Sequence, residues 1–144
     1  MRVSQKTEYA LRALLDLSLN VTGERAARTS EIAKRARVPE KFLEAILVEL
    51  RKAGLVRSRR GPDGGHALAR APATITLGQI RTALDGPLAL VEPAPRRRSD
   101  DPVEAAIRET WHQADVDIGA VLEGVSLESI QRRVLASQSP DFSI

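Results

Sequence analysis

Three arginines beside a run of glycines are the residues of this sequence best suited to binding an anionic partner. The arginines lie just before the segment GPDGG at positions 61–65. Guanidinium groups can contact phosphates or enter a narrow minor groove of DNA. Glycines let a backbone approach a sugar-phosphate chain closely. The candidate contacts here are Arg57, Arg59, Arg60, Gly64, Gly65 and His66.

The same glycine segment has a second interpretation as a nucleotide-binding loop. It lacks the Lys-Ser/Thr ending and the strand-to-helix context of such a loop. Asp63 also opposes a simple anion cradle. We therefore interpret the segment as the tip of a β-hairpin, with nucleotide binding as the second choice.

Residues 39–52 form the other candidate contact surface. Leu43, Ile46, Leu47 and Leu50 have the spacing of one helix face. A recognition helix presents its N-terminal part to base edges in the major groove. Carboxylates there repel phosphates but can accept a hydrogen bond from cytosine N4, so this helix alone fits a solvated surface equally well. The candidate contacts on this helix are Glu40, Lys41, Phe42, Glu44, Ala45 and Arg51, and Thr29 and Ser30 are further candidates at the start of the preceding short helix.

The elements expected around these residues are those of a winged helix-turn-helix. Ser4 can cap a helix to about residue 19, and Thr29 can cap a short helix over 30–37. The helix 39–52 ends at Gly54, and strands 55–60 and 66–69 flank the glycine turn. Thr76 caps a further helix over 77–85. The expected fold is mainly α with a two-stranded β-wing.

The second half of the chain predicts a long dimerisation helix. Pro102 suits the first helical position after a cap at Asp100 or Asp101, and the helix should run to about Glu123. Ser126 can cap a last helix. The expected units are a DNA-binding domain at 1–86, a linker at 87–101, dimerisation helices at 102–136 and a flexible tail at 137–144. The expected seam has heptad spacing and consists of Ile107, Trp111, Ala114, Ile118, Val121 and Val125.

Composition excludes several classes of function. The 144 residues include no cysteine, which removes disulfides, thiol nucleophiles and thiolate metal sites. The two histidines have no neighbours at ligand spacing, so we expect no metal, no cofactor and no enzyme activity. No apolar run suits a membrane span or a signal peptide, so we expect a cytoplasmic protein.

Charge divides unevenly along the chain. Residues 1–70 hold 15 Lys and Arg against eight Asp and Glu, a balance of +7. Residues 71–144 hold seven against 11, a balance of −4. A basic half joined to an acidic half favours a polyanion-binding module followed by a second unit, although an arginine-rich composition alone could produce it.

Two long segments make the sequence similar to a known family. RVSQKTEYALRALLDLSLN at 2–20 and TSEIAKRARVPEKFLEAILVELRKAGLVRSRRGPDGGHAL at 29–68 resemble the Rrf2 family of bacterial winged-helix regulators, as does VSLESI after the long helix. The resemblance implies a homodimer, usually a repressor, with helix 39–52 in the major groove and the wing in the minor groove. By position it implies contacts at Lys41, Phe42 and Ala45, a wing arginine at Arg60, and His66 where an aromatic residue is usual.

The departure from that family concerns its iron–sulfur cluster, which many members bind through three cysteines. Ala105 stands at the third cysteine position and Arg108 at that of a nearby histidine ligand. Glu8 matches an acidic ligand of some members, but Arg12 is not a ligand. One carboxylate without thiolates will not hold a cluster. Control by a small ligand or a partner protein is therefore expected.

These observations together predict a sequence-specific, double-stranded-DNA-binding transcriptional regulator. The resemblance implies a homodimeric repressor, and a two-fold dimer implies a palindromic operator. The alternative is a winged-helix interaction module that acts through a partner enzyme or polymerase. A salt titration separates the two, because only a DNA binder loses affinity steeply as salt rises.

Overall fold

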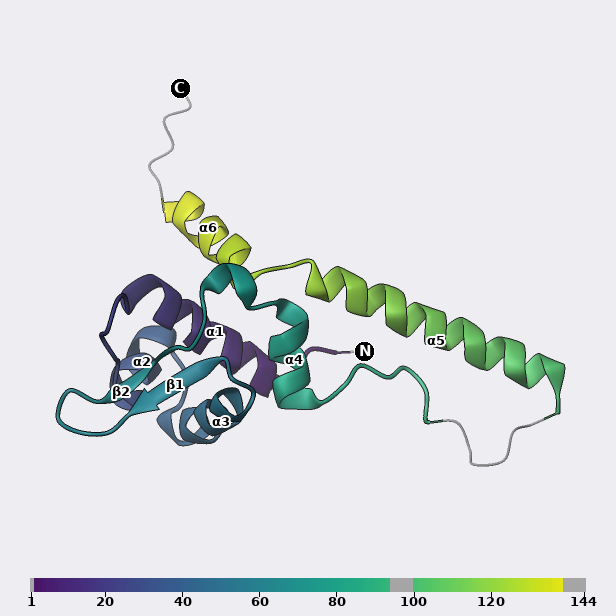
Figure 1. Ribbon diagram of the computed structural model, residues 1–144, viewed down its shortest axis with the longest axis horizontal. Coiled ribbons are helices and arrows are strands. Elements are labelled where there is room, and N and C mark those ends of the chain that lie inside the picture. Colours follow the sequence, from purple (N-terminus) through teal and green to yellow (C-terminus); the bar gives the residue numbers. More distant parts are fainter. Residues whose placement is uncertain (1, 94–99, 139–144) are drawn as a thin grey trace, which may run out of the picture.

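A computed structural model describes residues 2–93 and 100–138 of the chain (Figure 1). A compact group of helices carries a β-hairpin on one side, and a long helix projects from the other. The mainly helical winged fold is therefore as predicted. The elements are α1 Gln5–Asn20, α2 Thr29–Ala36, α3 Glu40–Lys52, β1 Val56–Arg59, β2 Gly65–Leu68, the 3-10 helix η1 Pro72–Thr74, α4 Leu77–Asp85, α5 Pro102–Glu123 and α6 Leu127–Gln138.

Helix starts agree with most of the predicted caps. The hydroxyl of Ser4 accepts from the Thr7 amide at 3.1 Å, and Thr76 and Gln79 form a reciprocal capping box. The prediction that Thr29 caps α2 is wrong, because Arg28 is the N-cap residue and Thr29 is the first helical residue. The Glu31 carboxylate accepts from the Arg28 amide at 3.2 Å, which satisfies one of the donors exposed at a helix start.

The hydrophobic core is formed by helices α1, α2, α3 and α4 together with the base of the hairpin. All four apolar residues predicted to face inward from α3 are buried, so the 3.6-residue pattern there is confirmed. Pro39 is the N-cap of α3 rather than its first helical residue. The largest fully buried side chains of the core are Leu14, Leu17, Ile32, Leu43, Leu50, Leu55, Ile75, Ile80 and Leu127.

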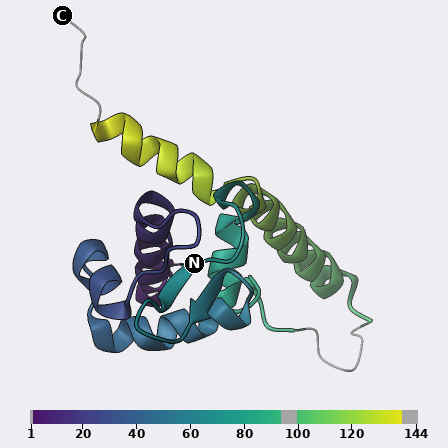
Figure 2. The same ribbon diagram turned by 60° about the vertical axis from the view of Figure 1, so that its left-hand side comes forward.

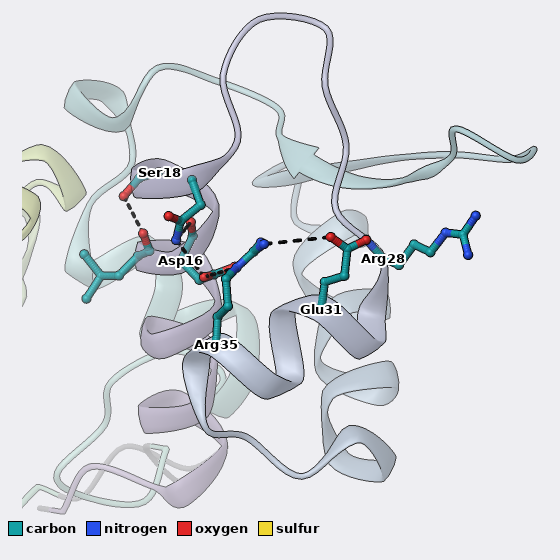
Figure 3. Close-up of polar contacts among 7 residues, drawn as sticks. Asp16, Ser18, Arg28, Glu31 and Arg35 are labelled. Carbon is teal, nitrogen blue, oxygen red and sulfur yellow. Dashed lines mark hydrogen bonds and ion pairs between the residues drawn. The ribbon is translucent and has the colours of Figure 1, made fainter.

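A buried carboxylate on α1 fixes the position of α2. The Asp16 side chain is 4% exposed, and its two oxygens accept from Arg35 Nε at 2.9 Å and Nη2 at 3.0 Å (Figure 3). Asn20 donates to the same carboxylate at 2.9 Å. The hydrogen bond with Asp16 raises the pKa of Arg35. This fork-to-fork geometry restricts both the distance and the rotation between the two helices.

A second polar junction joins the start of α1 to the end of α4. The hydroxyls of Ser4 and Thr7 each lie 2.7 Å from Asp85 Oδ2 and donate to its carboxylate. Burial raises the pKa of Asp85, but these hydrogen bonds together with the positive charges of Arg81 and Lys6 outweigh burial, so the net pKa is lowered. They also offset the unfavourable position of a negative charge at a helix C-terminus.

The C-terminal helices attach to the winged domain through a short backbone bridge. The Leu77 amide donates to the Val125 carbonyl, and the Leu127 amide donates to the Ile75 carbonyl, both at 2.8 Å. Leu127 is fully buried. Helix α6 then packs across the end of α1 (Figure 2), while α5 extends away from the domain.

The expected unit of dimerisation helices at 102–136 corresponds to α5 and most of α6. Helix α6 packs on the winged domain, because its first residue completes the core. It ends at Gln138, two residues beyond the expected boundary. Residues 94–99 of the predicted linker and 139–144 of the predicted tail lie outside the described residues. No helix in the described ranges is long and apolar enough to cross a membrane.

We predict unequal costs for breaking the Asp16–Arg35 pair. Arg35→Ala leaves a buried carboxylate poorly paired and should lower the free energy of unfolding by about 2–4 kcal/mol. Asp16→Asn should cost about 1 kcal/mol, because the Arg35 side chain is 38% exposed and can turn into water. Urea denaturation measures both values.

The matched control is Arg12→Ala, which breaks an exposed pair with Glu8 on α1. It should change the free energy of unfolding by at most about 0.5 kcal/mol. Equal losses for Arg35→Ala and Arg12→Ala would contradict a structural role for the buried pair.

Candidate nucleic-acid interface

Helix α3 presents an exposed face that carries every contact predicted on it. Glu40, Lys41, Phe42, Glu44, Ala45 and Arg51 are all exposed. The opposite face is buried in the core. The helix is thus held rigidly by one face while the other remains available.

Phe42 stands at the edge of this face and is fixed by aromatic stacking. Its ring lies 6.2 Å from that of Tyr9 with an interplanar angle of 21°, and it remains 46% exposed. The Lys41 ammonium lies 4.9 Å from the Phe42 ring centroid. Gln5 donates to the Tyr9 hydroxyl at 2.9 Å. The start of α3 is therefore held against α1 by a stack that continues onto a cation.

The arginines of the wing lie on and near the hairpin. Arg57 donates to the Gly23 carbonyl at 3.2 Å, and Arg59 donates to the Asp63 carbonyl at 3.1 Å. Arg60 is exposed at the start of the turn. Arg57 and Arg59 are thus hydrogen-bonded to the protein's own backbone.

Gly64 and Gly65 of the wing are required by close backbone contacts within the protein, which the sequence alone did not indicate. A Cβ at Gly64 would overlap the Arg59 carbonyl oxygen, and a Cβ at Gly65 would overlap the Ala27 carbonyl. Gly65 also has a φ of 143°, which side chains rarely adopt. Both glycines therefore permit close contacts within the protein itself.

A set of contacts that we call the wing anchor ties the hairpin to the start of α2. It comprises a backbone bridge between Ala27 and His66, the side-chain contacts of His66, and an Arg28 hydrogen bond. His66 Nε2 lies 3.0 Å from the Thr29 hydroxyl, and Nδ1 lies 2.8 Å from that of Ser58. Arg28 Nη2 donates to the Pro62 carbonyl at 2.8 Å. His66 and Thr29, both predicted as DNA contacts, thus act here in positioning the wing.

Burial lowers the pKa of His66, and the positive charge of Arg51 lowers it further. Its two ring nitrogens lie between hydroxyls that can each donate or accept. The neutral imidazole therefore links α2 to β1 without placing a second charge beside Arg51.

The space between the wing and α2 is a hollow of about 530 Å³. Three arginines line it, but so do Glu24, Glu31 and Asp63. The glycine turn joins strand to strand, whereas a phosphate-binding loop joins strand to helix. Neither observation favours the nucleotide-binding interpretation.

Sequence reasoning missed two exposed arginines near this surface. Arg28 lies beneath the hairpin in Figure 3, and its only sequence signal is the Thr-Ser-Glu helix start that follows it. Arg37 occupies the turn between α2 and α3 with a φ of 58°. Glycine would adopt that conformation at lower cost, so the backbone at Arg37 is strained.

The predicted dimer seam lies along one face of α5. Ile107 is 55% exposed and Val121 is 68% exposed. The adjacent face meets the chain's own domain, since Asp115 accepts from the Leu90 amide at 2.9 Å and Glu123 accepts from Thr76. Val125 lies beyond the end of α5, where its carbonyl belongs to the bridge with Leu77.

The residues at the family's cluster position do not fit an iron–sulfur cluster. The chain has no cysteine, and the Glu8 carboxylate is paired with Arg12 at 3.4 Å. Arg108 donates to the Glu92 carbonyl. Across residues 2–93 and 100–138, no three His, Asp or Glu side chains gather as metal ligands.

Comparison with known proteins supports the fold and the class of function. The Rrf2 family, described as iron-dependent transcriptional regulators, matches residues 3–133. A Rhodobacter capsulatus helix-turn-helix protein named rrf2-like is 43% identical over 89 residues, which are 60% of this chain and 59% of that protein.

Solved structures extend the match over nearly the whole chain. CymR of Bacillus subtilis, the global cysteine regulator, aligns with a TM-score of 0.73 and 32% identity, covering 92% of this chain and 98% of CymR. IscR of T. potens aligns with a TM-score of 0.75 and 30% identity, covering 98% and 93%. These proteins are transcriptional regulators and not enzymes.

The wing anchor predicts a pH-dependent contribution to stability. Because the pKa of His66 is below its ordinary value of 6.5, the unfolded chain binds this proton more readily than the folded one. The contribution is therefore complete above pH 6.5 and is lost as pH falls from there through the folded pKa. Urea denaturation between pH 5 and pH 7.5 should show a smaller loss of stability in His66→Gln than in the unsubstituted protein.

His112→Gln is the matched control, because that histidine is exposed on α5. It should keep the pH dependence of the unsubstituted protein. If His112→Gln flattens the profile and His66→Gln does not, His66 does not carry the effect.

Proposed function

This chain belongs to the Rrf2 family of transcriptional regulators, and on that premise we propose that it is a homodimeric repressor of a palindromic operator. Helix α3 would enter the major groove and the wing would reach the adjacent minor groove. A small ligand or a partner protein, rather than an iron–sulfur cluster, would control it. No thiolate is available to bind such a cluster.

The observation that carries this proposal is the wing anchor. It fixes the hairpin to α2, which is joined to α3 by a turn of three residues, 37–39. The wing and the exposed face of α3 are therefore parts of one rigid surface. Such a surface can contact two grooves at once without the cost of ordering a mobile loop.

Charge on this surface suits a duplex. Lys41 and Arg51 lie on α3, Arg37 at the turn before it, and Arg60 at the wing. Cations placed this widely can contact phosphates on both sides of a groove. Glu40 and Glu44 oppose indiscriminate phosphate binding and can accept hydrogen bonds from cytosine N4.

The proposed dimer uses the seam of α5. Its 22 residues span about 33 Å, enough to cross a second copy over several turns. The neighbouring face of α5 meets the chain's own domain at Asp115 and Glu123, which leaves Ile107, Trp111 and Val121 of the seam exposed. A two-fold dimer would place two α3 helices about one DNA turn apart, hence the palindrome.

Arg60→Ala tests the role of the wing in DNA binding. If Arg60 neutralises a phosphate, its loss should reduce the slope of log affinity against log salt by about one per subunit. Fluorescence anisotropy on selected and scrambled duplexes, each at several salt concentrations, measures the slope.

Arg132→Ala on α6 is the control, since this arginine is also exposed but pairs with Glu128 away from the wing. Its slope should match that of the unsubstituted protein. Absence of duplex binding by the unsubstituted protein at every salt concentration would reject the proposal and favour the interaction-module alternative.

The double substitution Ile107→Glu with Val121→Glu tests the dimer. Both side chains are exposed within one chain, so charges there should leave the winged domain folded while burying unpaired carboxylates in a dimer. Sedimentation velocity should give a monomer, with unchanged helix content by circular dichroism.

Val116→Glu is the control, because Val116 is exposed on α5 at a position outside the heptad seam. It should sediment like the unsubstituted protein. A double mutant that sediments as a dimer would show that α5 is not the interface.

A further inference from the structure

Two apolar side chains occupy the middle of the exposed face of α3. Val48 is 38% exposed and Ala45 is also exposed. With Lys41 before them and Lys52 after them, they have the spacing four, three and four of one line along a helix. The middle of this line is thus apolar and its two ends are cationic, while Glu40 and Glu44 lie beside the line on the same face.

Neither packing in the core nor helix propensity accounts for a valine at position 48. The buried residues of α3 lie on the opposite side of the helix. A β-branched side chain at an exposed position weakens a helix slightly compared with alanine. A lone exposed apolar residue is ordinary, but this one adjoins Ala45 on the face proposed to enter the groove.

The pattern of charge and apolarity selects one kind of partner group. The two lysines suit the phosphates that border a groove. Within the major groove, the apolar group displayed by base edges is the C5 methyl of thymine. We infer that Ala45 and Val48 read thymine by contact with this methyl, an inference that rests on the proposed function and names the bases it selects.

The helix geometry limits how many thymines can be read. Ala45 and Val48 are three residues apart, or about 4.5 Å along the helix axis. Successive base pairs are about 3.4 Å apart. Ala45 and Val48 of each subunit should therefore read methyl groups at one base pair or at two adjacent base pairs.

Thymine and uracil differ only by this methyl, which makes the inference directly testable. The full-length protein is used to select duplexes from a random library made with thymidine. Each thymidine of a selected site is then replaced singly by deoxyuridine, and affinity is measured by anisotropy. Replacement at one or two adjacent positions in each half-site should weaken binding about fourfold per methyl, as expected for one buried carbon group. Replacements outside the base pairs that face α3 should have no effect.

Val48→Ala assigns the effect to α3. This variant should bind the deoxyuridine site as the unsubstituted protein does, and the thymidine-to-deoxyuridine ratio should fall toward one at the position that Val48 reads. Val116→Ala on α5 is the matched control and should keep the full ratio. The ratio compares two duplexes on one protein, so differences in folded fraction between variants cancel.

The outcomes separate this inference from the proposed function. Failure to bind any duplex rejects both. Site-specific binding with equal affinity for every thymidine and deoxyuridine pair overturns methyl reading and leaves DNA binding intact. A methyl effect that Val48→Ala leaves unchanged assigns the contact to another element and also overturns the inference.

Discussion

The buried carboxylate of Asp16 is the constraint on which the arrangement of the winged domain depends. A carboxylate that is 4% exposed must be paired, and Arg35 supplies two parallel hydrogen bonds from α2. Helix α2 is only eight residues long and would be marginal without such support. The positions of α3 and of the wing both depend on α2. Helix α3 follows α2 after a short turn, and the wing is hydrogen-bonded to the start of α2 through Thr29 and Arg28.

The elements of this fold could be predicted from sequence because their signals are local. The spacing of four apolar residues fixed which face of α3 is buried, and Ser4, Thr76 and Pro102 marked helix starts within a residue or so. The fastening of the wing could not be predicted this way. His66 meets Thr29 across 37 positions and Arg28 meets Pro62 across 34, and no periodicity reports such pairs. The sequence therefore located the candidate surface while assigning His66 and the glycines to contacts outside the protein.

The junction between α5 and α4, at the other end of the domain, also depends on a carboxylate that accepts a hydrogen bond from a neighbouring helix start. Glu123 lies against the start of α4, where it accepts from the Thr76 hydroxyl at 2.9 Å. A Cβ at Gly78 would overlap the Glu123 carboxylate in this orientation, so a side chain at position 78 would displace the Glu123 side chain. A negative charge near a helix N-terminus is favourable. The end of the long helix is thereby held to α4, and α4 is held through Asp85 to the start of α1.

Internal hydrogen bonds of the wing arginines and contacts with DNA are compatible. A guanidinium has five N–H donors in one plane, and Arg57 and Arg59 use only part of theirs on backbone carbonyls. The internal bonds hold each side chain in one orientation before a partner arrives, which lowers the entropy lost on binding. The positive charge is not cancelled, because carbonyl oxygens are neutral acceptors. A wing built in this way keeps its charge available for the proposed phosphate contacts, while backbone carbonyls hold the side chains of Arg57 and Arg59.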